Sequence, residues 1–231
     1  MLYMTQENFW LLYGDINMAL SKVDYNSLNV TAAASKALKW NSGADGFETG
    51  DVAGALVLLE TQTASSSATL DFTDNIDSTY NEYVFKFIDI HPATNDVHFS
   101  FNGSDDDSSH SYDVTKTTTN FRAHHSEGGT SDLSYRTGGD KAQSADFQNI
   151  AAEVGNDNDQ CAVGTLHLFN PSSTTFVKHF ISRCNIYNAS DYNRDDYVAG
   201  YFNTTADITA IQFKMSSGNI DAGVIKLYGV S

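Results

Sequence analysis

The chain has 231 residues, 41% hydrophobic and 18% charged, which is long enough and apolar enough to fold around one large core. Its formal net charge is −16, from 29 acidic and 13 basic residues, and such a surface repels the phosphate backbone of nucleic acids. Two cysteines, Cys161 and Cys184, are too few for a disulfide scaffold or a structural zinc cage, and we expect two buried free thiols rather than a pair.

Residues 1–17, MLYMTQENFWLLYGDIN, differ in character from the rest of the chain. We expect translation to start at Met18, because residues 14–15 can be encoded as GGA-GAT, which reads as a ribosome-binding sequence just upstream of that codon. The alternative is a short amphipathic N-terminal helix whose apolar residues 9–12 dock on a partner. Intact mass of the native protein distinguishes the two.

Residues 18–53 are predicted to form an N-terminal anchor or connector. The stretch from residue 29 to residue 54 is rich in Ala and Gly and carries the single Trp40, which is too little apolar surface for a second core. No apolar run approaches the ~20 residues of a membrane-spanning helix, and no basic segment followed by an apolar one marks a secretory signal. We therefore expect no membrane insertion.

Residues 54–231 form a series of short apolar or alternating runs separated by polar turns. In DVHFSFN, at 96–102, the apolar Val97, Phe99 and Phe101 alternate with polar residues, as in a strand with one solvated face. The other predicted strands are residues 54–62, 67–72, 83–90, 111–118, 164–170, 175–187, 197–203, 210–215 and 223–229. About ten strands at this spacing predict an all-β fold, an antiparallel β-sandwich. Residues 142–154 are left open between a helix and a strand.

The chain ends in two predicted strands joined by a Ser-Gly-Asn turn at 217–219. Ile225 and Leu227 alternate on the last strand, so we expect it to be paired within a sheet and buried on one side. Removal of residues 224–231 is therefore predicted to abolish folding.

Two long polar stretches, residues 103–111 and 123–144, are predicted to be exposed loops with a binding role or high mobility. We single out His124, His125 and Tyr135 in the second stretch, together with Tyr192, as candidates for ligand contact. The adjacent histidines are the most metal-like pair, but no third ligand stands at a useful spacing, which favours a solvated pair. Further tyrosines occur in or beside polar segments, and we expect core packing or subunit contact for most of them: Tyr112, Tyr187 and Tyr197.

Two acidic clusters offer the hard oxygen ligands that calcium prefers. They comprise Asp105, Asp106 and Asp107 in the first loop and Asp157 and Asp159 in the sequence NDND. Neither has the residue order of a helix–loop–helix calcium site, so the alternative is a pair of acidic surface turns. No other cofactor is indicated.

Motifs of catalysis are missing from the sequence: it contains neither a G-x-S-x-G elbow nor a G-x-x-x-x-G-K-[ST] phosphate loop. Carboxylates are numerous, but nothing singles out a glycosidase pair. We therefore expect a protein that is not an enzyme.

Three segments carry a family resemblance: residues 55–104, residues 168–183 (LFNPSSTTFVKHFISR) and residues 198–231, which include the terminal G-x-I-K-L-Y-G strand. From about residue 28 to residue 231 the chain resembles small jelly-roll-like virion proteins of marine tailed bacteriophages. The segment AASKALKW, followed by a Gly- and Asp-rich link, is similar to the connectors of phage tail-fibre proteins. The resemblance implies a jelly-roll-like sandwich and a structural role in the virion, after assembly in the cytoplasm of the host bacterium.

From the resemblance we expect a tail-fibre or receptor-binding component that contacts other virion proteins and a glycan or protein of the host surface. A homotrimer is expected, because jelly-roll virion modules commonly form closed symmetric rings. The alternative is a capsid decoration protein whose N-terminal segment clasps neighbouring capsid subunits. A carbohydrate-active enzyme or a free lectin is a third possibility, and fold alone does not separate the three.

Overall fold

The computed structural model describes residues 36–50 and 54–231, and the expected start at Met18 and the alternative helix within residues 1–17 lie outside them. The chain divides into two compact units, residues 1–53 and residues 54–231.

In the first unit, the described residues form a two-stranded antiparallel hairpin of β1 (Ala37–Trp40) and β2 (Phe47–Gly50). Trp40 and Phe47 are direct cross-strand partners, and their rings stack with centroids 4.4 Å apart. Lys39 and Glu48 form the next pair, on the opposite face, with Nζ and Oε1 3.6 Å apart. The expected connector therefore contains an amphipathic hairpin, apolar on one face and charged on the other.

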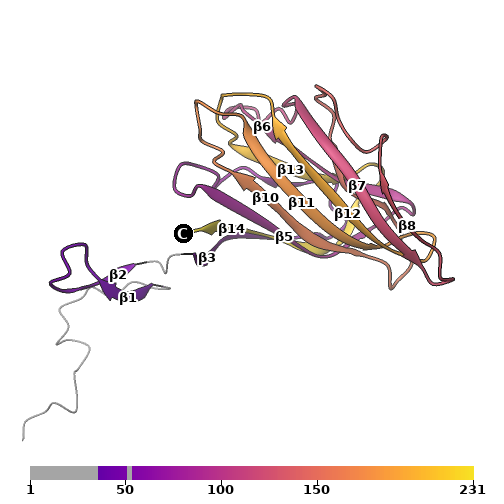
Figure 1. Cartoon of the computed structure of the whole chain (residues 1–231), viewed down its shortest axis with the longest axis horizontal. Helices are drawn as coiled ribbons and strands as arrows, with labels where there is room; N and C mark the ends of the chain where they lie inside the picture. The colour runs from indigo at the N-terminus through magenta and orange to yellow at the C-terminus, as the bar shows by residue number, and fades with distance from the viewer. Residues whose placement is uncertain (1–35, 51–53) are drawn as a thin grey trace, which may run out of the picture. The chain divides into compact units, whose positions relative to one another are not determined.

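The second unit is an antiparallel β-sandwich, as predicted (Figure 1). Its strands are β3 (Leu56–Thr63), β4 (Leu70–Phe72), β5 (Glu82–Pro92), β6 (Val97–Ser104), β7 (Lys116–Ser126), β8 (Ser131–Tyr135), β9 (Gln148–Val154), β10 (Ala162–Phe169), β11 (Lys178–Tyr187), β12 (Tyr192–Phe202), β13 (Ala210–Met215) and β14 (Ile220–Val230). The described residues contain no helix. The segment left open between helix and strand, residues 142–154, contains β9 and is thus resolved in favour of the strand.

The strand order identifies a jelly roll with four additional strands. One sheet runs β3-β14-β5-β10-β11-β12-β7-β8, and the other runs β4-β13-β6-β9. Eight of these strands can be numbered one to eight in chain order: β3, β4, β5, β6, β9, β10, β13 and β14. In this numbering the two sheets have the strand orders 1-8-3-6 and 2-7-4-5, which is the arrangement of a jelly roll. The hairpin β7–β8 is inserted between β6 and β9, and β11–β12 between β10 and β13. Both insertions extend the same sheet beyond β10.

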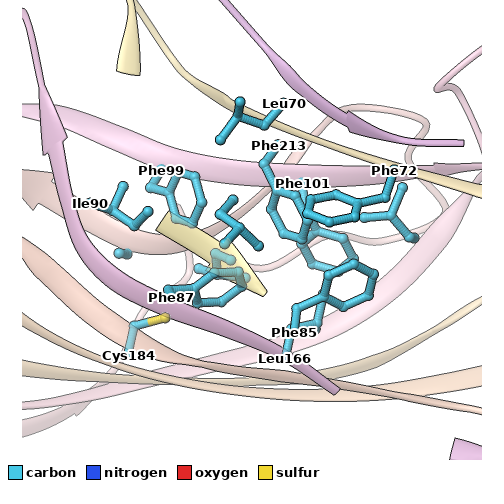
Figure 2. Close-up of a cluster of buried hydrophobic side chains, with 14 of the residues drawn as sticks. Leu70, Phe72, Phe85, Phe87, Ile90, Phe99, Phe101, Leu166, Cys184 and Phe213 are labelled. Atoms are coloured by element: carbon cyan, nitrogen blue, oxygen red, sulfur yellow. The ribbon is translucent and has the colours of Figure 1, made fainter. Parts of the chain in front are cut away.

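The core lies between the two sheets of the jelly roll and is dominated by phenylalanine rings (Figure 2). Phe213 of β13 is at its centre, with ring centroids 5.2 Å from Phe85, 5.3 Å from Phe87 and 5.7 Å from Phe99. Most of these pairs meet edge to face, the arrangement that the ring quadrupoles favour. The alternation of apolar and polar residues along each strand explains this packing, because successive residues of a strand face opposite sides of its sheet and every second one enters the core.

The terminal strand β14 lies inside the larger sheet, hydrogen-bonded to β3 on one side and to β5 on the other. Ile225 and Leu227 are fully buried. Gly223, with a φ of 124°, lies where the pairing with β5 is irregular, and a side chain there would meet the backbone of Asp89 and Ile90. The last strand therefore completes the sheet, as the alternation of its apolar residues predicts.

Two stretches of the sequence were predicted wrongly. Residues 123–144 are not a single loop, because β7 continues to Ser126 and β8 follows at Ser131–Tyr135. Residues 111–115, in contrast, precede β7 rather than belonging to a strand. The polar sequence AHHSEGGTSD resembles a loop, but β7 is paired along its whole length with β12, and this long-range pairing determines its structure.

Candidate functional site

The candidate site is the outer face of the added strands β11, β12, β7 and β8, together with the neighbouring β10. The register places Arg183, Tyr197, Phe121 and Tyr135 in one row across four adjacent strands. The next row consists of Val163, Asn185, Asp195, Ala123 and Leu133. Because the small sheet lies on the other side, both rows face away from the core. We call this surface the outer face.

An aromatic row crosses the outer face. The rings of Phe121 and Tyr197 are parallel within 4° and have centroids 4.7 Å apart. The guanidinium carbon of Arg183 lies 5.1 Å from the Tyr197 centroid. Tyr135 is the cross-strand partner of Phe121, and its hydroxyl donates to Asp140 Oδ2 at 2.7 Å. The row is thus a preorganised stack that is open to solvent at its β8 end, where Tyr135 is 52% exposed.

Arg183 is fixed in this row by Asp195 on the adjacent strand. The guanidinium donates to both carboxylate oxygens, from Nη2 at 2.6 Å and from Nε at 3.1 Å. The Tyr197 hydroxyl donates to Asp195 Oδ2 at 2.9 Å. This hydrogen bond to the Asp195 carboxylate raises the pKa of Tyr197, although the charge of Arg183 partly offsets it, and the phenol keeps its proton at neutral pH.

Two hollows lie on the outer face beside the aromatic row. The larger, of about 520 Å³, is lined by His125, Ser126, Glu127, Asn185, Tyr187 and Asn193. The smaller, of about 250 Å³, is lined by Val163, Gly164, Arg183, Asn185 and Asp195. Asn185 belongs to both, so the hollows adjoin. We call them together the outer groove.

Hydrogen bonds hold the side chains of the outer groove. Asn185 donates from Nδ2 to Asn193 Oδ1 at 2.7 Å and to the Arg194 carbonyl oxygen at 3.2 Å. The Tyr187 hydroxyl donates to Glu127 Oε1 at 3.2 Å. Burial and the nearby carboxylates of Glu127 and Asp191 raise the pKa of Tyr187 to about 12, so the phenol stays a donor at neutral pH.

The predicted contact residues lie on strands, not on a loop, which corrects the prediction of binding-loop residues. His124 and His125 are in β7, Tyr135 ends β8, and Tyr192 begins β12. Alternation along β7 separates the two histidines. His125 faces the outer groove, whereas His124 is on the inner face, where its ring stacks on Tyr192 with centroids 5.2 Å apart.

Beneath the outer face, the inner side of the added strands carries a partly buried charged cluster that the sequence analysis missed. Glu153 of β9 accepts from Arg136 Nη2 at 3.0 Å, and its other oxygen is 2.7 Å from Arg194 Nη1 and 3.6 Å from Arg122 Nη1. Arg194 Nε also donates to Asp196 Oδ1 at 2.7 Å, and both of these side chains are 1% exposed. Three guanidinium groups thus face two carboxylates.

The charged cluster shifts the pKa values of its members in opposite directions. Burial raises the pKa of Glu153, but the charges of Arg194, Arg136 and Arg122 outweigh it and hold that pKa below the ordinary value. Burial raises the pKa of Asp196, and Arg194 only partly offsets the effect. Burial and the Arg194 charge lower the pKa of His98, whose Nδ1 accepts from the Glu153 amide at 3.0 Å. A neutral His98 fits this hydrogen bond.

A third hollow, of about 600 Å³, lies at the other end of the sandwich. It is lined by Thr73, Asp74, Asn75, Ile76, Asp77, Ser78, Asp107, His110, Ser172, Asp207 and Thr209. The predicted loop 103–111 therefore contributes to a hollow through Asp107 and His110. Buried atoms of His110, Asp207 and Thr209 have no hydrogen-bond partner among the described residues.

The two acidic clusters differ in their local contacts. Asp106 accepts hydrogen bonds from Ser108 and Ser109, which hold its pKa far below the ordinary value, and Asp105 accepts from Thr204 Oγ1 at 3.1 Å. The Asp157 carbonyl oxygen accepts from the Gln160 amide in a turn. In the described part of the chain, no group of three or more His, Cys, Asp or Glu residues is arranged to hold a metal ion. Calcium binding at Asp105, Asp106, Asp107, Asp157 or Asp159 stays a prediction.

Both cysteines are free thiols, as expected, but only Cys184 is buried as predicted, beside Ser182, whereas Cys161 is half-buried. Burial raises the pKa of Cys184 to about 12, which suppresses the thiolate that a nucleophile or metal ligand requires. Burial and the charge of Asp89 raise the pKa of Cys161 as well.

Comparison with protein-family models, with curated proteins and with solved structures yields no match to this chain. Among the described residues, no helix is long and apolar enough to cross a membrane.

Proposed function

We propose that this protein is a non-enzymatic structural component of a bacteriophage virion, of the tail-fibre or receptor-binding kind. The observation that carries the proposal is the outer face of β11, β12, β7 and β8, four strands that a jelly roll does not contain. In the proposed role, this face contacts the host surface while the jelly roll supports it.

The side chains of the outer face support a binding role. Leu133 is 70% exposed, and Ile181, Tyr135 and Phe121 are each more than 40% exposed. Packing within the described sandwich does not require these residues. Large apolar side chains gathered on an open surface are typical of a contact site, and aromatic residues and arginine are the side chains that contribute most to binding.

The charged cluster beneath favours binding over catalysis. Its carboxylates are engaged by guanidinium groups or by the Ala152 amide, which donates to Asp196 Oδ2 at 2.9 Å. It lies on the inner face, between β9 and the added strands. Its geometry suits a polar layer that adds to the apolar contacts of Phe180 and Phe202 in holding the added strands on the sandwich.

A homotrimer located in the virion is part of the proposal. Both edge strands of the larger sheet, β3 and β8, carry exposed apolar side chains, and a closed ring of subunits protects such edges. Native mass spectrometry of the full chain should then give about 76 kDa, three times the 25.2 kDa of one chain. A stable monomer at micromolar concentration contradicts the trimer.

A second candidate function is capsid decoration, and the hairpin β1–β2 favours it. Trp40 is 60% exposed, and Leu38 and Phe47 are also exposed. An isolated two-stranded hairpin is marginally stable in water, so an apolar face of this kind suits a partner subunit. The hairpin then corresponds to the clasp on capsid subunits that a decoration protein needs.

An adsorption assay tests receptor binding. Host cells preincubated with the full chain should adsorb the phage more slowly, and Phe121→Ser combined with Tyr135→Ser should remove this competition. Phe176→Ser is the matched control, since Phe176 is 68% exposed in the connection between β10 and β11, away from the outer face and from both edge strands. Unchanged adsorption, together with binding of the chain to emptied capsids, contradicts receptor binding and supports decoration.

A further inference from the structure

The outer groove has the size and chemistry of a site for a small polar ligand. Its larger hollow, of about 520 Å³, falls in the range of about 300–1,000 Å³ that is usual for small-molecule sites. The lining combines amide, hydroxyl, imidazole and carboxylate groups with one aromatic ring, that of Tyr187. Hydrogen-bond donors and acceptors therefore lie next to the ring of Tyr187 in the lining of one hollow.

The hydrogen bonds already present determine which groups are left for a ligand. Asn185 donates from its amide nitrogen to Asn193 Oδ1 and to the Arg194 carbonyl oxygen, which directs its own Oδ1 away from those partners. No other described residue bonds Asn185 Oδ1 or Asn193 Nδ2. One amide thus offers an acceptor and the other a donor, a pairing that matches a hydroxyl group, which both donates and accepts.

The charges of the groove select against an anionic ligand. Arg183 is the sole lysine or arginine among the described lining residues, and its guanidinium is already held by both oxygens of Asp195. Glu127 adds a carboxylate, and the whole chain carries a net charge of −16. A phosphate, sulfate or uronate group would therefore enter without a cationic partner.

We propose that the outer groove binds a neutral oligosaccharide, with Tyr187 as the aromatic surface and Asn185, Asn193 and His125 as hydroxyl partners. Sugar rings present apolar C–H faces and a rim of hydroxyl groups, which is the complement of this lining. The inference rests on the proposed function, because it names the class of host-surface molecule that the outer face contacts.

A glycan array probed with the full chain and detected by antibody tests the inference, followed by calorimetry on a neutral glycan that is captured. Asn193→Ala and Tyr187→Ala should each lower the affinity at least tenfold. His179→Ala is the control, because His179 is exposed on the outer face of the same strand as Asn185 but lies outside the groove, and it should change the affinity less than twofold. Far-UV circular dichroism verifies that each variant is folded.

Three results overturn the inference: capture of anionic glycans alone, capture of no neutral glycan, or equal loss of affinity in the His179 control. The test also separates this inference from the proposed function. A chain that competes with the phage for host cells but captures no neutral glycan leaves the proposed function standing. If the chain binds a neutral glycan through Asn193 but is missing from virions, the outer groove is a glycan site and the virion role is contradicted.

Discussion

Replacing Glu153 by glutamine tests the charged cluster most sharply, because the side chain keeps its size and loses only its charge. Glu153 accepts a hydrogen bond from Arg136 at 3.0 Å and forms an ion pair with Arg194 at 2.7 Å, and a hydrogen bond to a charged group contributes ~1.5–3 kcal/mol. The side chain is 30% exposed, so water weakens both contacts. We therefore expect Glu153→Gln to lower the free energy of unfolding by about 3 kcal/mol, the low end of the range for breaking a buried ion pair.

The loss should be visible in thermal unfolding. For a chain of this length, ~1 kcal/mol shifts the melting temperature by ~2–4 °C, so the variant should melt about 6–12 °C lower. Far-UV circular dichroism is the suitable probe, because both tryptophans, Trp10 and Trp40, lie outside the sandwich unit. Asp146→Asn is the control. Asp146 is 80% exposed and 3.7 Å from Lys141, so its loss should cost less than about 0.5 kcal/mol.

The pH dependence gives an independent check. The arginines hold the pKa of Glu153 below its ordinary value of 4.5. A carboxylate with a lowered pKa in the folded state stabilises the protein above its unfolded pKa, and this contribution is lost as pH falls through the folded pKa. The difference between wild type and Glu153→Gln should be constant from pH 7 to about pH 5.5 and shrink below pH 4.5. If Glu153→Gln and the Asp146→Asn control melt at the same temperature at pH 7, the charge of Glu153 does not stabilise the sandwich.

Three further predictions concern the sandwich. Burial and the charge of Lys141 lower the pKa of Lys116 to about 7, so Lys116→Met should stabilise the chain by about 1–4 kcal/mol at pH 6. Urea titrations should show this gain shrinking between pH 7 and pH 10, because the folded lysine is neutral there and the unfolded one is still charged. A gain that does not shrink argues against the lowered pKa. Deletion of residues 224–231 removes most of β14 from between β3 and β5 and should leave insoluble or unfolded protein; a soluble product with native circular dichroism contradicts the internal position of β14. Cys184 should react with a thiol reagent only after unfolding, and rapid labelling of this residue in the native chain contradicts its burial.

The sequence predicts those strands well that alternate strictly between apolar and polar residues. Residues 210–215 coincide with β13, and the prediction for 96–102 differs from β6 by one residue at its start and two at its end. In these strands, one face enters the phenylalanine core, and burial imposes the period that the pattern reveals. The same alternation predicts the last strand, β14.

Among the added strands, β11 keeps a strict alternation, with Phe180, Cys184 and Ile186 buried. Strand β7 and the first half of β12 were harder to predict, because their inner face is polar. Arg122, Arg194 and Asp196 occupy inward positions where an apolar residue would be expected, so β7 and β12 lose the alternation of hydrophobicity. The spacing of two residues between Arg194 and Asp196 indicates that both side chains lie on the same face of a strand. The sequence around them does not indicate that Glu153, on another strand, is their partner in the charged cluster. The outer groove depends on the same long-range pairing, which brings His125 beside Asn193.

Immunogold labelling of intact virions with antibody raised against the full chain tests the proposed function most directly. We expect gold on the tail or its fibres, at the places where the outer face would meet the host. Gold scattered over the head contradicts the tail-fibre role in favour of decoration, and unlabelled particles contradict a virion role altogether.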